Sequence, residues 1–325
     1  MATSHSVLTE PRTKHFGQPR SGGQITTFAR YLREREGVPE LDWASLDCNY
    51  QHLTTCFEPE LGILWCHQRH GERPCFSPGL LAEILDLQTR LQDAFVDRPR
   101  AEPALRYLVW ASSTPGIYNL GGDLCLFTQY IRAGDRASLH RYAKACIDIC
   151  YLNSVSLELP ILTVALVQGD ALGGGFEAAL SNDLIIAEAG SQFGLPEILF
   201  NMFPGMGAYS FLARRLDGTR ARQLILSGKL YGAEELAELG VVDLVVPAGE
   251  GEDALRTHLD RHAQRHGVLA ALARVGRRCH PVSYDELLDI ADIWVATALG
   301  LSETDLRRME RLASAQQRRQ ARAHA

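Results

Sequence analysis

Two glycine-rich stretches are the first residues of this chain whose type and spacing could do chemistry. The segment ALGGGFEAAL covers residues 171–180, and YNLGGDL covers residues 118–124. Glycine lets a backbone approach a ligand closely, and a helix that begins after such a turn adds free N–H groups with a partial positive charge. Two such N–H groups converging from separate loops would form an oxyanion hole for a carbonyl oxygen. Glycines at strand-to-helix turns can also serve packing alone, and neither GxGxxG nor GxxxxGK[ST] is present, which excludes the usual phosphate loops.

Two glutamates follow the second glycine stretch and strengthen the chemical interpretation. Glu177 is expected in the first turn of the helix after the glycines, and Glu197 follows twenty residues later in FGLPEILF. Each alone has a simple helix explanation, since a first-turn acid favours the helix dipole and Pro-Glu is a common helix start. Both glutamates nevertheless have apolar neighbours, and burial there would raise a carboxyl pKa toward the range useful for proton transfer.

The elements that must position these residues alternate between strand and helix. Apolar patterns predict strands at 60–68, 106–112, 163–169, 184–189 and 241–246, and helices at 78–95, 138–154, 176–182 and around 209–216. This alternation predicts an α/β fold in which crossover helices cover a parallel sheet. From about residue 255 only helical patterns remain. Such a helical appendix often closes a site or makes an oligomer contact.

Composition narrows the class of protein. The chain has 325 residues, 46% hydrophobic and 22% charged, which is typical of a soluble globular protein. A net charge of -6 argues against a nucleic-acid partner. We expect no membrane span and no secretory signal, and therefore a cytoplasmic location. The eight cysteines are scattered, and Cys66, His67, His70 and Cys75 lack the spacing of a zinc site, so no metal is expected.

These residues carry a family resemblance. The segment from ALVQGDALGGGFEAALSND to PEILFNMFPGMGAYSFLARRL resembles the signature of the crotonase (enoyl-CoA hydratase/isomerase) superfamily, and YNLGGDL resembles its first oxyanion loop. The resemblance covers roughly residues 60–250 and implies a spiral of repeated ββα units followed by a C-terminal helical region. Within the superfamily the chain is most similar to bacterial diffusible-signal-factor synthases. The features that point there are NLGGDLCLF, the insert QYIRAGDRASLHRYAKACID, the phrase GLPEILFNMFPGMGAYSFL and the late DIWVATAL.

The resemblance implies roles for particular residues. The N–H groups of Gly122 and Gly174 match the two donors that hold the thioester oxygen, and Glu177 and Glu197 match the two catalytic acids. In the family the second glutamate exchanges the proton beside the thioester, and the first handles the water or hydroxyl at the next carbon. No cofactor and no metal are implied. Further candidates for the substrate pocket, for each of which ordinary core packing is an equal explanation, are Gly121, Leu172, Gly173, Met202, Met206 and Trp294.

The implied function is that of a quorum-sensing signal synthase. It would dehydrate a 3-hydroxyacyl thioester, on acyl carrier protein, to a cis-2-enoyl product and hydrolyse the thioester to release the free fatty acid. The segment RPCFSP at 73–78 replaces the family's usual Asn-Ala turn, which favours a carrier-protein thioester over CoA. Two alternatives stay open: an ordinary enoyl-CoA hydratase or isomerase, and a non-catalytic protein that binds an acyl thioester or a signalling partner. A protein that only binds the thioester would need the cavity but not both glutamates and both glycine loops, and their presence disfavours the last alternative.

The sequence also predicts a division of the chain. Residues 1–48 are expected to be an N-terminal extension, 49–254 the crotonase core, and 255–325 a helical lid or oligomerisation region. The resemblance implies a homotrimer or hexamer and an association with a sensor-kinase receiver domain, and no nucleic-acid partner is expected.

Overall fold

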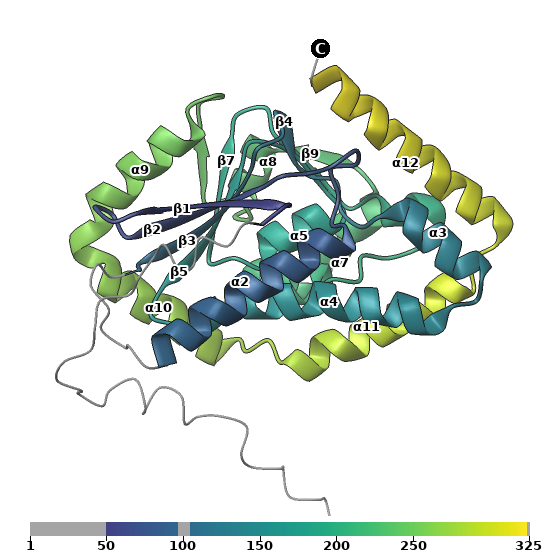
Figure 1. Cartoon of the computed structure of the whole chain (residues 1–325), viewed down its shortest axis with the longest axis horizontal. Helices are drawn as coiled ribbons and strands as arrows, with labels where there is room; N and C mark the ends of the chain where they lie inside the picture. Colours follow the sequence, from purple (N-terminus) through teal and green to yellow (C-terminus); the bar gives the residue numbers. More distant parts are fainter. Residues whose placement is uncertain (1–49, 97–104, 324–325) are drawn as a thin grey trace, which may run out of the picture.

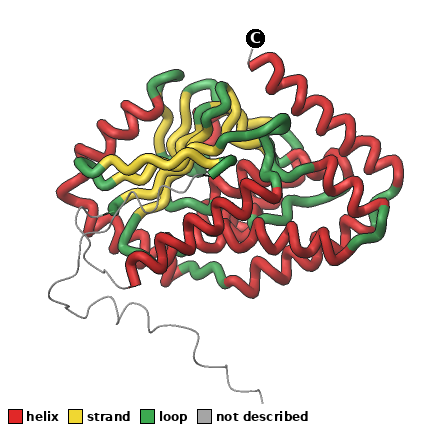
Figure 2. Tube along the Cα trace, in the orientation of Figure 1, coloured by secondary structure: helices red, strands yellow, loops and turns green. Residues whose placement is uncertain are grey.

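The structure is a computed structural model that describes residues 50–96 and 105–323. The extension expected at 1–48 lies outside the described residues. Strands gather in the middle of the molecule with helices on both sides, as Figure 2 shows.

The larger sheet has six strands in the order β1-β2-β3-β5-β7-β10. Its strands are β1 (Leu53–Glu58), β2 (Ile63–Gln68), β3 (Tyr107–Ser112), β5 (Leu162–Val167), β7 (Leu184–Glu188) and β10 (Leu244–Val246). The first two strands pair antiparallel and every later pair is parallel. The central strand β5, LTVALV, is buried along its whole length, as expected of a parallel strand covered on both faces.

The smaller sheet has four short strands in the order β4-β6-β8-β9. They are β4 (Gly116–Asn119), β6 (Gly169–Leu172), β8 (Gln192–Gly194) and β9 (Leu230–Gly232). Each of the first three directly follows a strand of the larger sheet, so that β3–β4, β5–β6 and β7–β8 form successive strand pairs, each followed by a helix. This repetition is the ββα spiral that the sequence predicts.

Helices cover both faces of the larger sheet (Figure 1). On one face α2 (Pro78–Val96) and α4 (Arg136–Ser154) pack together, and Asn153 of α4 donates to Ser181 at the end of α5 (Gly174–Leu180) at 3.2 Å. On the other face α9 (Gly251–His262) and α10 (His266–Cys279) pack Leu255, Leu259 and Ala270 against the sheet.

The remaining described helices complete the spiral and its appendix. They are α3 (Leu124–Arg132), α6 (Ala208–Arg215), α7 (Gly218–Ser227), α8 (Ala233–Glu238), α11 (Tyr284–Leu299) and α12 (Glu303–Ala323), with short 3-10 helices η2 (Ser156–Glu158), η3 (Pro196–Phe200) and η4 (Ala263–Arg265). In the appendix α11 packs on α4, and α12 crosses α3 and η3 (Figure 1). After β10 the described chain forms only helices, as predicted. No helix within the described ranges has the length and apolar character needed to cross a membrane.

The sequence pattern located the long elements better than the short ones. The predicted strands at 60–68, 106–112, 163–169 and 184–189 and the helices at 78–95 and 138–154 are present within a few residues. The strand predicted at 241–246 forms only at Leu244–Val246. The N–H groups of Val241 and Val242 instead bond to the carbonyl of Leu236 at the end of α8, which holds them out of the sheet.

Candidate active site

The two glycine loops lie against each other at the ends of β4 and β6. A Cβ atom added to Gly121 would lie 2.8 Å from the carbonyl oxygen of Leu172 and 2.9 Å from the nitrogen of Gly174. Gly121 also has a φ of +95°, a backbone conformation that residues with a side chain rarely adopt. A Cβ added to Gly174 would lie 3.5 Å from the nitrogen of Gly122. The glycines are therefore required for close backbone approach, and they bring the two predicted oxyanion donors together.

Glu177 is held by the start of another helix. Its side chain is buried in α5, and its Oε1 accepts hydrogen bonds from the N–H of Met206 at 2.7 Å and of Ala208 at 3.0 Å. Ala208 is the first residue of α6, so the carboxylate caps that helix. Burial raises the pKa of Glu177 to about 7, although these backbone bonds favour the ionised form and act against the rise.

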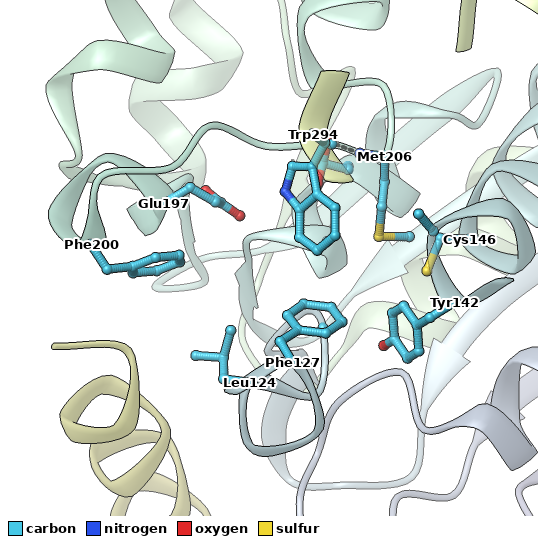
Figure 3. Close-up of a pocket in the computed structure, with 13 residues that line it drawn as sticks. Leu124, Phe127, Tyr142, Cys146, Glu197, Phe200, Met206 and Trp294 are labelled. Carbon is cyan, nitrogen blue, oxygen red and sulfur yellow. Dashed lines mark hydrogen bonds between the residues drawn. The ribbon is translucent and has the colours of Figure 1, made fainter. Parts of the chain in front are cut away.

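Glu197 has a different environment on η3. Its Oε2 is buried and has no hydrogen-bond partner among the described residues. Its Oε1 lies 2.8 Å from the position that a Cβ on Gly173 would take. Burial, followed by the charge of Glu177, raises the pKa of Glu197 to about 8. Figure 3 shows the Glu197 carboxyl turned toward Trp294.

One cavity of about 50 Å³ brings the predicted donors and acids together (Figure 3). Gly122, Gly174, Glu177 and Glu197 all line it, and the rest of its wall is mainly apolar. The other lining residues are Leu124, Phe127, Tyr142, Ala143, Cys146, Phe200, Gly205, Met206 and Trp294. Such a site joins two acid–base groups to two backbone N–H groups in surroundings of low polarity, which suits proton transfer next to a carbonyl.

The other predicted pocket residues divide into two groups. Met206 and Trp294 line the cavity. Within the described chain, the lining does not include Gly121, Leu172, Gly173 or Met202. Gly121 and Gly173 lie in the turns directly before the lining residues Gly122 and Gly174. Leu172 packs in a small separate cluster, and Met202 is buried, with its N–H donating to the Glu197 carbonyl at 3.0 Å.

One wall of the cavity, supplied by α3 and α4, is not among the residues that the sequence predicts for the site. The ring of Phe127 on α3 meets Tyr142 on α4 edge to face at 4.8 Å between centroids, and meets Trp294 on α11 at 5.1 Å. Tyr142 lies in the long insert at 129–148 and Phe127 lies just before it, and the helical apolar spacing of this stretch was the one available signal. Cys146 also lines the cavity, but burial keeps the pKa of its thiol well above the ordinary value. A protonated thiol is a poor nucleophile. The lining groups whose pKa values lie near neutrality are Glu177 and Glu197.

The scattered cysteines and histidines do not gather into a metal site in the described part of the chain. Cys66 packs in the main core, whereas His67 on the opposite face of β2 hydrogen bonds Glu252 of α9 at 2.9 Å. The two neighbours therefore point apart, as alternation along a strand requires.

Comparisons with known proteins agree with this geometry. Residues 85–275 match the enoyl-CoA hydratase/isomerase family. The chain is 32% identical over 182 residues to "Probable enoyl-CoA hydratase 2, mitochondrial" of Arabidopsis thaliana, covering 56% of this chain and 57% of that protein. It is 30% identical over 169 residues to the mitochondrial methylglutaconyl-CoA hydratase of Mus musculus, covering 51% of each. The chain thus spans about half the length of the curated relatives it matches.

Solved structures share the fold at lower identity. DspI of Pseudomonas aeruginosa has a TM-score of 0.61 at 21% identity, covering 73% of this chain and 91% of that one. An enoyl-CoA hydratase from Bacillus halodurans has a TM-score of 0.66 at 20% identity, covering 80% and 99%. With the ββα spiral, the paired glycine loops and the family match over more than half of its length, this chain belongs to the enoyl-CoA hydratase/isomerase family.

Proposed function

We propose that this protein dehydrates a 3-hydroxyacyl thioester to a cis-2-enoyl thioester and then hydrolyses the thioester, releasing a free fatty acid that serves as a quorum-sensing signal. The observation that carries the proposal is one cavity lined by Glu177, Glu197, Gly122 and Gly174. Two acids are needed because the reaction removes a proton at one carbon and a hydroxyl at the next.

Dehydration requires an ionised Glu197 and a protonated Glu177 at the start. The Glu197 carboxylate takes the proton beside the thioester, and the electrons move onto the carbonyl oxygen, which the N–H groups of Gly122 and Gly174 stabilise. Loss of one such donor typically costs about 2.7–4 kcal/mol. The electrons then return from the oxygen to form the carbon–carbon double bond, and the carbon–oxygen bond at the next carbon breaks as Glu177 gives its proton to the departing hydroxyl, which leaves as water. The pair ends with Glu177 ionised and Glu197 protonated.

Hydrolysis can start from that final state. Ionised Glu177 takes a proton from water, the water oxygen bonds to the carbonyl carbon, and the carbon–sulfur bond breaks as the sulfur takes the proton of Glu197. This returns the proton to Glu177 and leaves Glu197 as the base for the next dehydration. The pair keeps one proton throughout, so the two reactions in sequence restore the starting state. No additional nucleophile is required, in keeping with the protonated thiol of Cys146.

Acyl carrier protein is the proposed carrier of the substrate. The segment 73–78, which differs from the family pattern, runs beside the first glycine loop. The N–H of Phe76 donates to the carbonyl of Gly121 at 2.8 Å, and Arg73 bonds Asp123 at 2.7 Å. The segment in which this chain differs from the family pattern therefore lies close to the proposed thioester site. A difference at this place supports a thioester carrier other than CoA.

The test is product analysis with the purified protein. A medium-chain 3-hydroxyacyl carrier protein should give a free cis-2-enoic acid, identified by mass spectrometry and by comparison with cis and trans standards. Release of the unchanged 3-hydroxy acid, or accumulation of a trans-2-enoyl carrier protein, would contradict the proposal. The same fatty acid should be secreted by a bacterial host that expresses this chain and be absent from the empty host.

A second candidate, an ordinary enoyl-CoA hydratase, has an observation of its own. The backbone bonds favour an ionised Glu177, and the Glu197 oxygen that lacks a hydrogen-bond partner among the described residues favours a protonated Glu197. Water adds to a double bond from this protonation state. Crotonyl-CoA separates the two candidates. Its turnover at a higher kcat/KM than that of the 3-hydroxyacyl carrier protein would favour the hydratase.

The remaining expectations stay proposals about the same protein. We propose residues 255–325 as a lid and assembly region, supported by Trp294 in the cavity wall and by the contact of α12 with η3. A homotrimer or hexamer, a cytoplasmic location and a receiver-domain partner are further parts of this proposal. A non-catalytic binding role would predict tight thioester binding with no turnover of either substrate.

A further inference from the structure

A buried polar cluster lies beneath the first glycine loop, outside the cavity. At its centre is Asn119, the last residue of β4, whose side chain is fully buried. Its Oδ1 accepts from the N–H of Gly121 at 2.8 Å. Its Nδ2 donates to Oε1 of Gln68 at 2.8 Å and lies 3.3 Å from Nε2 of His70. The side chain of Asn119 therefore holds this loop in place through a hydrogen bond that the backbone of the loop does not supply itself.

The bond from Gly121 determines which way the loop presents its donors. An asparagine that accepts from the N–H two residues later forms an Asx turn. The carbonyl of Gly121 accepts from Phe76 at 2.8 Å, so both polar backbone groups of Gly121 are used inside the protein. The next donor along the chain is the N–H of Gly122, the residue that lines the cavity. The Asx turn thus sets the direction of the peptide that follows it.

Asn119 also touches the second glycine loop. A Cβ on Gly175 would lie only 2.0 Å from the carbonyl oxygen of Asn119. The pairing of β4 with β6 is irregular between Ile117 and Asn119, as at bulges that redirect a strand next to an active site. Asn119 therefore contacts both glycine loops without lining the cavity.

The partners of Asn119 hold its amide in one orientation. Gln68 is buried at the end of β2, and Nδ1 of His70 lies 3.1 Å from Oγ1 of Thr114. Burial, with a smaller effect of His52, lowers the pKa of His70 to about 4, so the ring is neutral at physiological pH. With its proton on Nδ1, facing Thr114, its Nε2 accepts from the amide of Asn119.

We propose that Asn119 is a positioning residue that aims the N–H of Gly122 at the thioester oxygen, and that Gln68 and His70 lock it in place. The inference rests on the proposed function only in taking a thioester as the ligand of the cavity. It assigns a role to a side chain that does not line the cavity.

A matched pair of variants isolates the Asx bond. Asn119→Ala and Asn119→Ser both lose the amide contacts to Gln68 and His70, but serine retains a hydroxyl that can accept from the N–H two residues on. The probe is S-butyryl pantetheine, a saturated thioester with no hydroxyl or double bond, at saturating concentration. Infrared difference spectroscopy measures its carbonyl stretch, which falls in frequency when the oxyanion donors polarise the bond.

We expect the wild-type protein to lower the carbonyl frequency, Asn119→Ser to retain most of that shift, and Asn119→Ala to lose most of it. In turnover, Asn119→Ala should lower kcat by up to about a hundredfold, below the full loss of an oxyanion donor, with a smaller change in KM. A purely structural role would lower stability and leave the frequency shift of the bound probe intact.

Asn153 supplies the control for general destabilisation. It is buried, and its Oδ1 accepts from Gln88 at 2.9 Å and from Trp110 at 3.0 Å, so Asn153→Ala removes a comparable set of bonds away from the glycine loops. It should keep the wild-type frequency shift at a similar loss of Tm. A wild-type shift in Asn119→Ala would overturn the inference and leave the proposed function standing.

Two further outcomes are decisive. If wild type binds the probe with no frequency shift, both the positioning role and the oxyanion assignment fail. If Asn119→Ala does not fold, Asn119→Thr, which keeps a hydroxyl able to accept from the N–H two residues on, is compared with Asn119→Val, which has nearly the same shape and no acceptor. A smaller shift in Asn119→Val than in Asn119→Thr supports the inference, and equal shifts overturn it.

Discussion

The two glutamates of the cavity lie in regions that are built differently. Glu177 is on α5, a helix whose seven residues are all buried, and two backbone N–H groups from the start of α6 hold its carboxylate. Glu197 is on a short 3-10 helix next to Ile198 and Leu199, which are 37% and 55% exposed. The protein therefore stabilises charge on Glu177, whereas one oxygen of Glu197 has no hydrogen-bond partner in the part of the chain that the structure describes. This difference explains how two identical side chains can share one proton unequally.

The appendix contacts both of these regions. A Cβ on Gly207, which caps α6, would lie 3.1 Å from Leu287 of α11, whereas the last helix, α12, packs on η3. Asp305 in the first turn of α12 lies close to the side chain of Asn201, which caps η3, where the two helices pack together. Met309 is buried against α3, with its sulfur 3.5 Å from Oγ1 of Thr128. The environment of Glu197 thus depends on the packing of α12, whereas that of Glu177 depends on the core.

Removal of either carboxyl is the largest expected effect. Glu177→Gln and Glu197→Gln should each lower fatty acid production from a 3-hydroxyacyl carrier protein by about a hundred- to ten-thousand-fold, because each removes a proton carrier. The measurement is product formed by the purified variants, with unchanged far-UV circular dichroism as the control for folding. Full activity in either variant would refute the assignment.

The pH dependence of kcat/KM tests whether the pair works with one proton. Below a pH of about 7 both carboxyls are protonated and no base is left, and above a pH of about 8 both are ionised and no acid is left. We expect a bell-shaped profile with its maximum between these values and a slope of about tenfold per pH unit on each side. An acid limb near pH 4.5 would show that burial does not raise these pKa values.

Loosening α12 should affect the Glu197 region selectively. Met309→Ala removes a buried side chain, which typically costs about 2–5 kcal/mol. The added exposure of Glu197 should lower its pKa and move the alkaline limb of the pH profile to lower pH. Amide hydrogen exchange should rise in α12 and η3 and stay unchanged in α5.

Arg132→Ala is the matched surface control for that variant. It removes the exposed ion pairs of Arg132 with Glu303 and Glu310, both at 2.6 Å, which are worth little in water. Its kcat and its pH profile should stay within about twofold of wild type. A shift in the alkaline limb as large as that of Met309→Ala would mean that the ion pairs, not the buried contact, hold the helix.

The smallest effect concerns stability alone. The pKa of Glu197 in the folded protein, about 8, is above the ordinary value of 4.5. The stability that this proton contributes is full below pH 4.5 and is lost as the pH rises through 8. Glu197→Gln has no carboxyl at this position and lacks this dependence. As the pH is raised from 4.5 to 9, the Tm of the wild type should therefore fall by a few degrees more than the Tm of Glu197→Gln. Thermal scans at both pH values measure the difference, and an equal Tm difference at both would contradict it.

Sequence reasoning worked best where an element is long or a motif is dense. The helices Pro78–Val96 and Arg136–Ser154 repeat their apolar pattern over several turns, so the pattern locates them. The strands of the smaller sheet have only three or four residues, too few for a period to be visible. The sequence pattern does not predict them for that reason, although β4 and β6 lead into the glycine loops.

The sequence by itself determined the class of fold, the family and the residues that could do the chemistry, because glycines and acids at fixed spacing are local properties. Only the tertiary structure decided that α6 holds Glu177, that Phe127 and Tyr142 complete the cavity, and that Asn119 contacts both loops. These contacts join residues far apart in the chain. Their distances depend on how whole helices and sheets pack, and no local pattern encodes that packing.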